Sequence, residues 1–327
     1  MKKIIPPVDT KLLEMELTED KFLRETNVGH NYIYIITAHD SPNVMREIGR
    51  LREITFRKAG GGTGNEIDID EYDTAKIPFK QLIVWNSEAK EIVSSYRFIL
   101  GNEVPLDVNG YPHTPTSKLF LFSKKFIEGK WQKTIELGRS FVQPKYQGTS
   151  NPKLGLFSLD NIWDGLGTLA VDYPEVSFFL GKMTMYNSYN RLARNLILFF
   201  LKKYFKGDKN LITPFFPAEG DKRKQVFQSV FRNNTYKEDF RVLNDNIRDL
   251  KTSIPPLIKS YMSLSSKMKC FGATANPEFG PVEEIAIMIK IADINEDKKR
   301  RYIYSYKSRK KKRKRKKKAA LASSLYI

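Results

Sequence analysis

The order of apolar segments is the feature that most constrains the fold of this 327-residue chain. The run YIYIIT (32–37) is rich in β-branched and aromatic residues, which is typical of a strand. Ser41 and Pro42 then provide a helix N-cap and a first-turn proline. Apolar residues recur at helical spacing after them, which predicts an amphipathic helix over about 43–58.

The segments that follow continue this alternation. LIVWN (82–86) and EIVSSYRFILG (91–101) predict a hairpin, and TIELGRSFV (134–142) predicts a fourth strand. The later expected elements are a helix over 154–169, a strand over 176–181, a helix over 189–205, and an edge strand in the final apolar run IAIMIKIA. The sequence therefore predicts a mixed α/β fold around one sheet.

The charge of the chain is distributed unevenly. Of its 56 basic residues, 15 lie between 298 and 318, where no acidic residue occurs, leaving 41 basic against 37 acidic elsewhere. The formal net charge of +19 therefore belongs mainly to a C-terminal tail.

Cysteine use and hydropathy point to a soluble protein in a reducing compartment. The single Cys270 excludes an intramolecular disulfide and a cysteine-based zinc cluster. The N-terminus has two lysines but no apolar stretch of signal-peptide type. The longest apolar run, 196–201, is too short to span a membrane. We expect a cytoplasmic protein with at most a peripheral contact at the inner face of the membrane.

An acidic segment, GTGNEIDIDEYDT (62–74), stands out in this basic chain. Its carboxylates are suited to a metal, a cationic substrate or the protein's own arginines. A calcium loop that started at Asp68 would need an oxygen ligand at Tyr72 and a glycine at Asp73, so no metal is predicted. A solvated acidic loop remains an alternative.

Charged residues inside apolar strands favour internal pairing of this acidic segment. Arg97 lies within SSYRF, and Glu136 and Arg139 lie within ELGRS. A buried arginine is costly unless a carboxylate pairs with it. We therefore expect a semi-buried network of both signs.

The spacing of these charges resembles a known family. Arg52, Phe56, Asp68-x-Asp70-x-x-Asp73, Arg97 and Glu136-x-x-Arg139 resemble the acyl-homoserine-lactone synthases, GNAT-superfamily enzymes that take acyl chains from acyl carrier protein. Longer stretches resemble the hemolysin-like acyltransferases that make ornithine or glycine lipids: IGRLREITFRKAGGGTG, DIDEYDT, LIVWN, EIVSSYRF, ELGRSFVQPKYQ and PPLIKSYMSLSSKMKCFGATANPEFG. The resemblance covers about residues 44–295.

The resemblance implies a GNAT-like acyl-CoA N-acyltransferase fold, with a mixed central sheet flanked by helices and a C-terminal helical extension. We expect a lead-in over 1–30, the acyltransferase domain over 31–296 and a disordered lysine- and arginine-rich tail over 297–327. The implied reaction moves a (3-hydroxy)acyl chain from acyl carrier protein to the amino group of a small amino acid, with glycine favoured and ornithine next. No cofactor is expected, since the phosphopantetheine thioester is a co-substrate.

Roles for individual residues follow from the same resemblance. Glu136 is the candidate base, and a bulge at Gly138 would bring Arg139 to the same site. Backbone N–H groups near Phe141 and Val142 would meet the oxyanion, and Tyr189 would protonate the leaving thiolate unless it is a core residue. The remaining charged candidates bind the amine or brace the arginines, and bracing is favoured: Arg52, Asp68, Asp70, Asp73 and Arg97.

Two other functions compete with this interpretation. One is a signal synthase that uses S-adenosylmethionine as acceptor. The other is a non-enzymatic nucleic-acid or membrane binder that acts through the tail. The run Arg309–Lys318 (RKKKRKRKKK) suits an anionic membrane surface or acidic acyl carrier protein as partner. Specific nucleic-acid recognition is not expected, because the remainder is nearly neutral.

Overall fold

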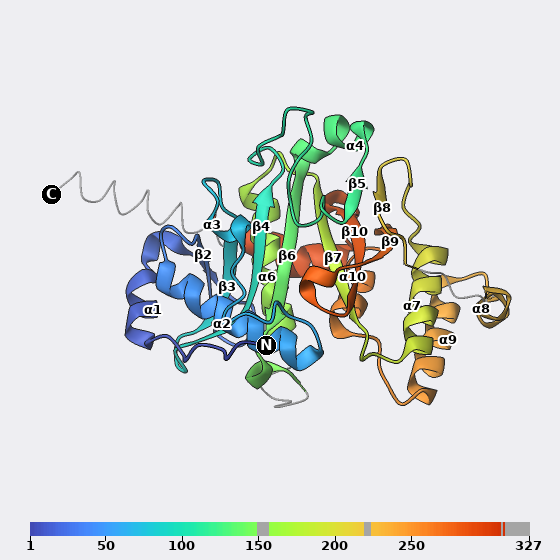
Figure 1. Cartoon of the computed structure of the whole chain (residues 1–327), viewed down its shortest axis with the longest axis horizontal. Coiled ribbons are helices and arrows are strands. Elements are labelled where there is room, and N and C mark those ends of the chain that lie inside the picture. The colour runs from blue at the N-terminus through green and yellow to red at the C-terminus, as the bar shows by residue number, and fades with distance from the viewer. Residues whose placement is uncertain (149–156, 219–223, 309, 311–327) are drawn as a thin grey trace.

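An eight-stranded mixed sheet organises the computed structural model, which describes residues 1–148, 157–218, 224–308 and 310 (Figure 1). The strands are β1 (Phe22–Glu25), β2 (Tyr32–Ile36), β3 (Lys80–Asn86), β4 (Glu91–Leu100), β6 (Thr134–Val142), β7 (Phe178–Tyr186), β9 (Lys269–Ala275) and β10 (Val282–Lys290). Their spatial order is β1-β2-β3-β4-β6-β7-β10-β9. Neighbours pair antiparallel except β6 and β7, which are parallel. A separate two-stranded sheet pairs β5 (Phe120–Phe122) with β8 (Ile212–Pro214).

Helices cover both faces of the main sheet. The helices are α1 (Thr10–Glu16), α2 (Pro42–Ala59), α3 (Glu71–Thr74), α4 (Lys124–Gly129), α6 (Ser158–Asp172), α7 (Arg191–Tyr204), α8 (Lys224–Val230), α9 (Tyr236–Asp249), α10 (Pro256–Leu264) and α11 (Glu296–Lys298). Strand β3 shows the two faces: Ile83 and Trp85 belong to the core under α2, whereas Leu82 and Val84 belong to the core with α6. This alternation is the period of two that a strand imposes.

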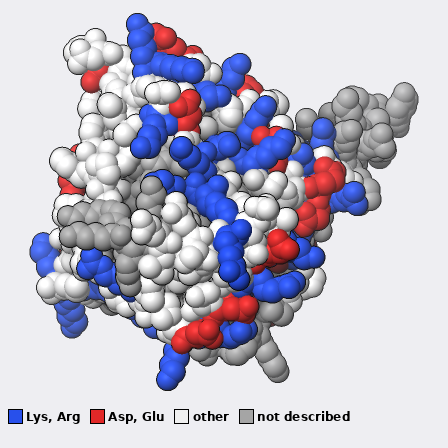
Figure 2. Space-filling view, turned by 90° about the vertical axis from the view of Figure 1, so that its right-hand side faces the viewer, with Lys and Arg blue, Asp and Glu red and all other residues white. Residues whose placement is uncertain are grey.

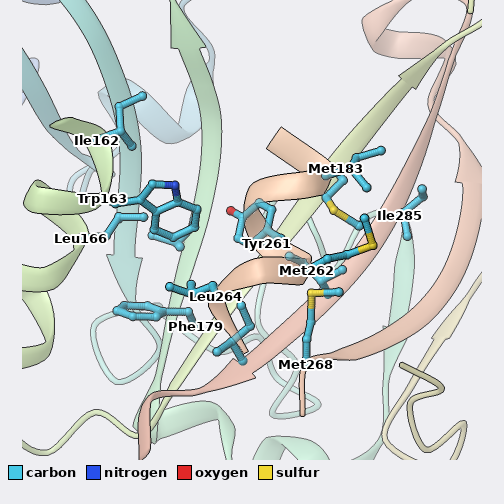
Figure 3. Close-up of a cluster of buried hydrophobic side chains, with 14 of the residues drawn as sticks. Ile162, Trp163, Leu166, Phe179, Met183, Tyr261, Met262, Leu264, Met268 and Ile285 are labelled. Carbon is cyan, nitrogen blue, oxygen red and sulfur yellow. The ribbon is translucent and has the colours of Figure 1, made fainter. Parts of the chain in front are cut away.

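The larger core joins α6 to α10 and to strands β7 and β10. In Figure 3, Trp163 of α6 faces Tyr261 of α10, and their ring centroids lie 5.2 Å apart in an edge-on arrangement. Met183, Met262 and Ile285 fill the space beside them. Flexible methionines suit such an irregular junction between a helix and two strands.

One expectation about strands was wrong. The run IAIMIKIA belongs to β10, which lies between β7 and β9 and is not an edge strand. Its residues 285–289 are buried on both faces, and a nearly continuous apolar run is the pattern of such a central strand. The edge strand on this side is β9, and its sequence KCFGATA is too weakly apolar to predict a strand. The lead-in contains β1, which pairs with β2.

The expectation of disorder from residue 297 onward was wrong for residues 297–308. After α11 the chain continues as a π-helical turn (Lys299–Tyr304) and a further helical turn to residue 308. Tyr302 is buried, and its hydroxyl donates to Asp160 Oδ1 of α6 at 2.6 Å. This segment thus packs on α6, while residues 311–327, most of the basic run, lie outside the described residues.

Strands β6 and β7 separate after a short stretch of pairing. Their parallel ladder runs only from Thr134 to Glu136 on β6. On the other edge of β6, Arg97 is opposite Gly138, but Ser95 is opposite Phe141, so β6 carries one extra residue. The expected bulge is therefore present, and Arg139, with φ of 48°, takes the left-handed conformation beside Gly138.

Candidate active site

A pocket of about 1330 Å³ lies at the separation of β6 and β7. Its size exceeds that of a typical drug-sized site, so it has room for an acyl chain and an acceptor together. Charged residues of β4, β6, β7 and β10 contribute to its lining. Large apolar and aromatic side chains also line it, among them Phe56, Phe141, Tyr146, Leu159, Leu257 and Phe279.

Arg52 of α2 is fully buried and is paired internally. Its Nη1 donates to Asp73 Oδ2 at 2.9 Å, and its Nη2 donates to Gln81 Oε1 at 2.7 Å. Gln81 in turn donates to Asp73 Oδ1 at 2.9 Å. Burial alone would raise the pKa of Asp73, but Arg52 and Arg97 outweigh it and hold that pKa well below its usual value.

The other two arginines also face aspartates. Arg97 Nη1 donates to both oxygens of Asp70, at 2.7 and 2.8 Å. Arg139 Nε lies 3.0 Å from Asp68 Oδ2. Burial raises the pKa of Asp68, although Arg139 opposes this shift. Three arginines and three aspartates thus neutralise one another inside the wall of the pocket.

The spacing of Asp70 and Asp73 has a second, local cause. Asp70 is the N-cap of α3 and accepts from the backbone N–H of Asp73 at 3.2 Å, while Asp73 Oδ2 accepts from the N–H of Asp70 at 3.2 Å. This reciprocal pattern is a capping box. The acidic segment therefore braces arginines and caps a helix, which leaves it little capacity to hold a substrate amine.

Glu136 differs from these aspartates because it makes no ion pair with a described lysine or arginine. Its side chain is 1% exposed and lines the pocket. Oε1 accepts from the backbone N–H of Thr116 at 3.1 Å, while Oε2 has no hydrogen-bond partner among the described residues. A buried carboxylate oxygen without a partner is costly, and a ligand that donates to it would remove that cost.

The two candidate oxyanion donors, the backbone N–H groups of Phe141 and Val142, point toward opposite edges of β6. Gln143 N donates to Val93 O of the strand on one side, at 3.0 Å. Successive N–H groups of a strand point to opposite edges, so the N–H of Val142 points toward the separation from β7. Phe141 points its N–H toward β4, and its side chain is buried against Phe56. Of this pair, only Val142 directs its N–H away from β4, so it is the one that stays a candidate oxyanion donor.

Tyr189 does not line the pocket. It follows β7 in the turn before α7, and its hydroxyl donates to the backbone oxygen of Ser253 at 2.8 Å. Tyr96 and Tyr186 line the pocket instead. Burial raises the pKa of Tyr96 to about 12 and that of Tyr186 further, so both hydroxyls stay protonated near neutral pH.

Sequence reasoning missed the polar residues that β7 and β10 contribute. Lys182, Thr184 and Tyr186 alternate with Met183 and Met185 in KMTMY, so one face of an apolar strand is polar. These three residues line the pocket, as does Glu284 of β10, which pairs with Thr184 in the ladder. The alternation was the signal that would have found them.

Comparisons with known proteins agree with this fold. Residues 51–156 match the family model of the acetyltransferase (GNAT) domain. The chain is 52% identical over 303 residues to the glycine N(alpha)-acyltransferase of Phocaeicola vulgatus, covering 93% of each chain. It is 54% identical over 303 residues to the protein of the same name from Bacteroides thetaiotaomicron, covering 93% of this chain and 90% of the relative.

Two solved structures are more distant. FeeM, an N-acyl amino acid synthase from uncultured soil microbes, is 11% identical with a TM-score of 0.38, covering 80% of this chain and 93% of its own. BjaI, a CoA-dependent acyl-homoserine lactone synthase, is 15% identical with a TM-score of 0.30, covering 47% and 67%.

The family match and the separated strands together define an acyltransferase of the GNAT class. At more than 50% identity over nearly its whole length, the chain belongs to the glycine N(alpha)-acyltransferase family.

Proposed function

We propose that this enzyme transfers a (3-hydroxy)acyl chain from acyl carrier protein to the amino group of glycine, forming the amide of an amino-acid lipid. The names of the two relatives support glycine as acceptor. The observation that carries the proposal is Glu136, a buried carboxylate with a free oxygen, in the pocket where β6 and β7 separate.

The proposed chemistry is aminolysis of a thioester. The acceptor nitrogen must lose a proton to attack, since free amines are mostly protonated near neutral pH. Glu136 takes that proton as nitrogen bonds to the carbonyl carbon, and the N–H of Val142 donates to the oxyanion. The carbon–sulfur bond then breaks, and the nitrogen releases a second proton as the amide forms. That proton reaches the thiolate directly or through the hydroxyl of Tyr96 or Tyr186, while Glu136 returns the first proton to solvent.

The donor is proposed from the segment after β6. Enzymes of this fold that use acetyl-CoA carry a glycine-rich turn whose amides bind the pyrophosphate. QPKYQGTSNPKLG, residues 143–155, does not match that turn. A phosphopantetheine arm has a single phosphodiester, so it requires fewer backbone amides to bind it. Residues 149–156 lie outside the described residues, so the sequence alone supports this step.

Ornithine is the second candidate acceptor, and Glu284 is the observation that favours it. This buried carboxylate also lines the pocket, makes no ion pair among the described residues, and accepts from Thr184 Oγ1 at 3.2 Å. A second carboxylate would suit the side-chain ammonium of ornithine.

The experiment combines purified protein with several acyl carrier protein thioesters, the matching acyl-CoA thioesters and a panel of amino acids that includes glycine and ornithine. We expect acyl-glycine to dominate the amides found by mass spectrometry, and the carrier-protein thioester to be the better donor. Release of methylthioadenosine from S-adenosylmethionine, with no amide of a free amino acid, would contradict the proposal.

We further propose an anionic membrane surface as a partner of the basic run Arg309–Lys318, in a protein of the cytoplasm. No helix among the described residues has the length and hydropathy needed to cross a bilayer. On the side of α7, α8 and α9, Figure 2 shows acidic residues among the basic ones, and ion pairs such as Lys203–Asp239 occur there. This mixture does not form the uniformly basic stripe of a nucleic-acid site.

Truncation after Lys310 tests the role of the tail. We expect the shortened protein to keep its amide-forming rate on soluble substrates and to lose binding to vesicles that contain anionic lipid, because each basic residue near such a surface contributes about 1 kcal/mol. A matched truncation after Asp297 should instead lower the Tm, since it removes the buried Tyr302. Absence of amide formation in both the full-length and the shortened protein, with vesicle binding lost on truncation, would support the non-enzymatic binder.

A further inference from the structure

Lys182 of β7 is a pocket cation without an ionic partner. Its Nζ donates to Thr116 Oγ1 at 3.2 Å, and it makes no ion pair with any described carboxylate. The pocket arginines Arg97 and Arg139 differ, because aspartates already neutralise them. A partly buried ammonium group that lines the pocket and makes no ion pair with a described carboxylate is therefore available to a ligand.

Thr116 holds this cation near the candidate base. Its backbone N–H donates to Glu136 Oε1 at 3.1 Å, and its hydroxyl accepts from Lys182. One threonine thus separates a positive and a negative group that do not contact each other. Both groups face the pocket from adjacent strands, β6 and β7. A free α-amino acid carries the complementary pair, a carboxylate and an amino group joined through one carbon.

We propose that Lys182 binds the carboxylate of the acceptor amino acid while Glu136 faces its amino group. This inference rests on the proposed amino-acid N-acylation and names the residue that selects a free amino acid. The acceptor binds beside Thr116 as a zwitterion, with its carboxylate at Lys182 and its amino group at Glu136. This orientation directs the nitrogen to the separation of β6 and β7. An amine without a carboxylate loses this contact and leaves the lysine unpaired.

The electrostatics of the pocket agree with this assignment. Burial lowers the pKa of Lys182, and Glu284 and Glu136 oppose that shift without reaching ion-pair distance. A carboxylate that enters beside the ammonium would offset its desolvation. The remaining possibility is that Lys182 itself, in its neutral form, removes the proton from the acceptor. The two roles differ in how they respond to an acceptor that lacks a carboxylate.

Steady-state kinetics with glycine and glycinamide separate these roles. We expect the wild type to show a KM for glycinamide higher than that for glycine by about tenfold or more, the effect of one charge-assisted hydrogen bond. Lys182→Gln should raise the KM for glycine by about the same factor and leave glycinamide little changed. Lys182→Arg should restore part of the discrimination because it keeps the charge.

Lys118→Gln is the matched control, because Lys118 also lines the pocket but is already paired with Glu71 at 2.7 Å. It should not change the ratio of the two KM values. Retained glycinamide turnover in Lys182→Gln shows that the variant is folded. An equal loss of kcat with both acceptors would assign Lys182 to proton transfer, and an unchanged glycine KM would place the carboxylate elsewhere. Either result overturns the inference.

The wild-type measurements test the proposed function separately. If the wild type acylates another amino acid in place of glycine, the acceptor proposal fails, and the same comparison runs with that amino acid and its amide. Loss of discrimination in Lys182→Gln would then still support the carboxylate contact. A wild type that acylates no amino acid would overturn both.

Discussion

Replacing Glu136 with glutamine should lower kcat for amide formation by about 10²- to 10⁴-fold, the usual contribution of a positioned general base. Glutamine preserves the size of the side chain and can still accept from the backbone N–H of Thr116. It cannot take a proton from the acceptor. The KM for the acyl donor should stay near its wild-type value, because the thioester does not depend on that carboxylate for binding.

The dependence on pH distinguishes proton transfer from a general loss of charge. As the pH rises, a larger fraction of the free amine is already neutral, so the deficit of Glu136→Gln relative to wild type should shrink. Glu284→Gln is the matched control, since it removes the same charge from the same pocket. Equal losses in both variants, with a deficit that does not vary with pH, would contradict the role of Glu136 as base.

Sequence reasoning found the site residues whose charged side chains are costly to bury within their own strand. Arg97 and Glu136 lie in runs of apolar residues, where an unpaired charge would be expensive, so their presence predicts a partner or a ligand. The strand bounds of β6 were also predictable, because the run TIELGRSFV is bounded by polar residues. These features depend on local sequence.

The parts that were missed depend on which residues meet in three dimensions. Lys182 and Glu284 lie on β7 and β10, which become neighbours only through the antiparallel ladder between them. The choice of the aspartates between bracing and substrate binding likewise required partners from α2 and β4. The register shift beside Arg139 was expected as a bulge at Gly138, because a regular period of two would place Glu136 and Arg139 on opposite faces of the sheet.

Replacing Asp73 with alanine should lower the free energy of unfolding by about 3–5 kcal/mol, because it leaves the buried guanidinium of Arg52 without its anion. Neither side chain of this pair has any exposed surface. Arg97 adds to the cost, since its Nη1 lies 3.2 Å from Asp73 Oδ2. The measurement is denaturant unfolding at neutral pH, and Asp245→Ala, which breaks an exposed pair with Arg248, serves as the control with little expected change.

Acidification should reveal the same contribution in the wild type. Because the folded pKa of Asp73 is depressed, its contribution to stability is fully present above the unfolded value of about 3.9 and is lost as the pH falls through the lower folded pKa. Asp68 acts in the opposite direction, since burial raises its pKa, so it offsets part of this loss. The wild type should therefore lose its advantage over Asp73→Ala as the pH falls below about 4.

A double variant tests whether the pair acts as a unit. Arg52→Met combined with Asp73→Leu removes both charges, so it should be less destabilised than Asp73→Ala alone. Recovery should be incomplete, because Arg97 keeps Asp70 but loses its contact with Asp73. If Asp73→Ala unfolds at the same denaturant concentration as the wild type, the acidic segment does not brace the arginines. Its carboxylates would then be free to bind the acceptor amine in competition with Glu136.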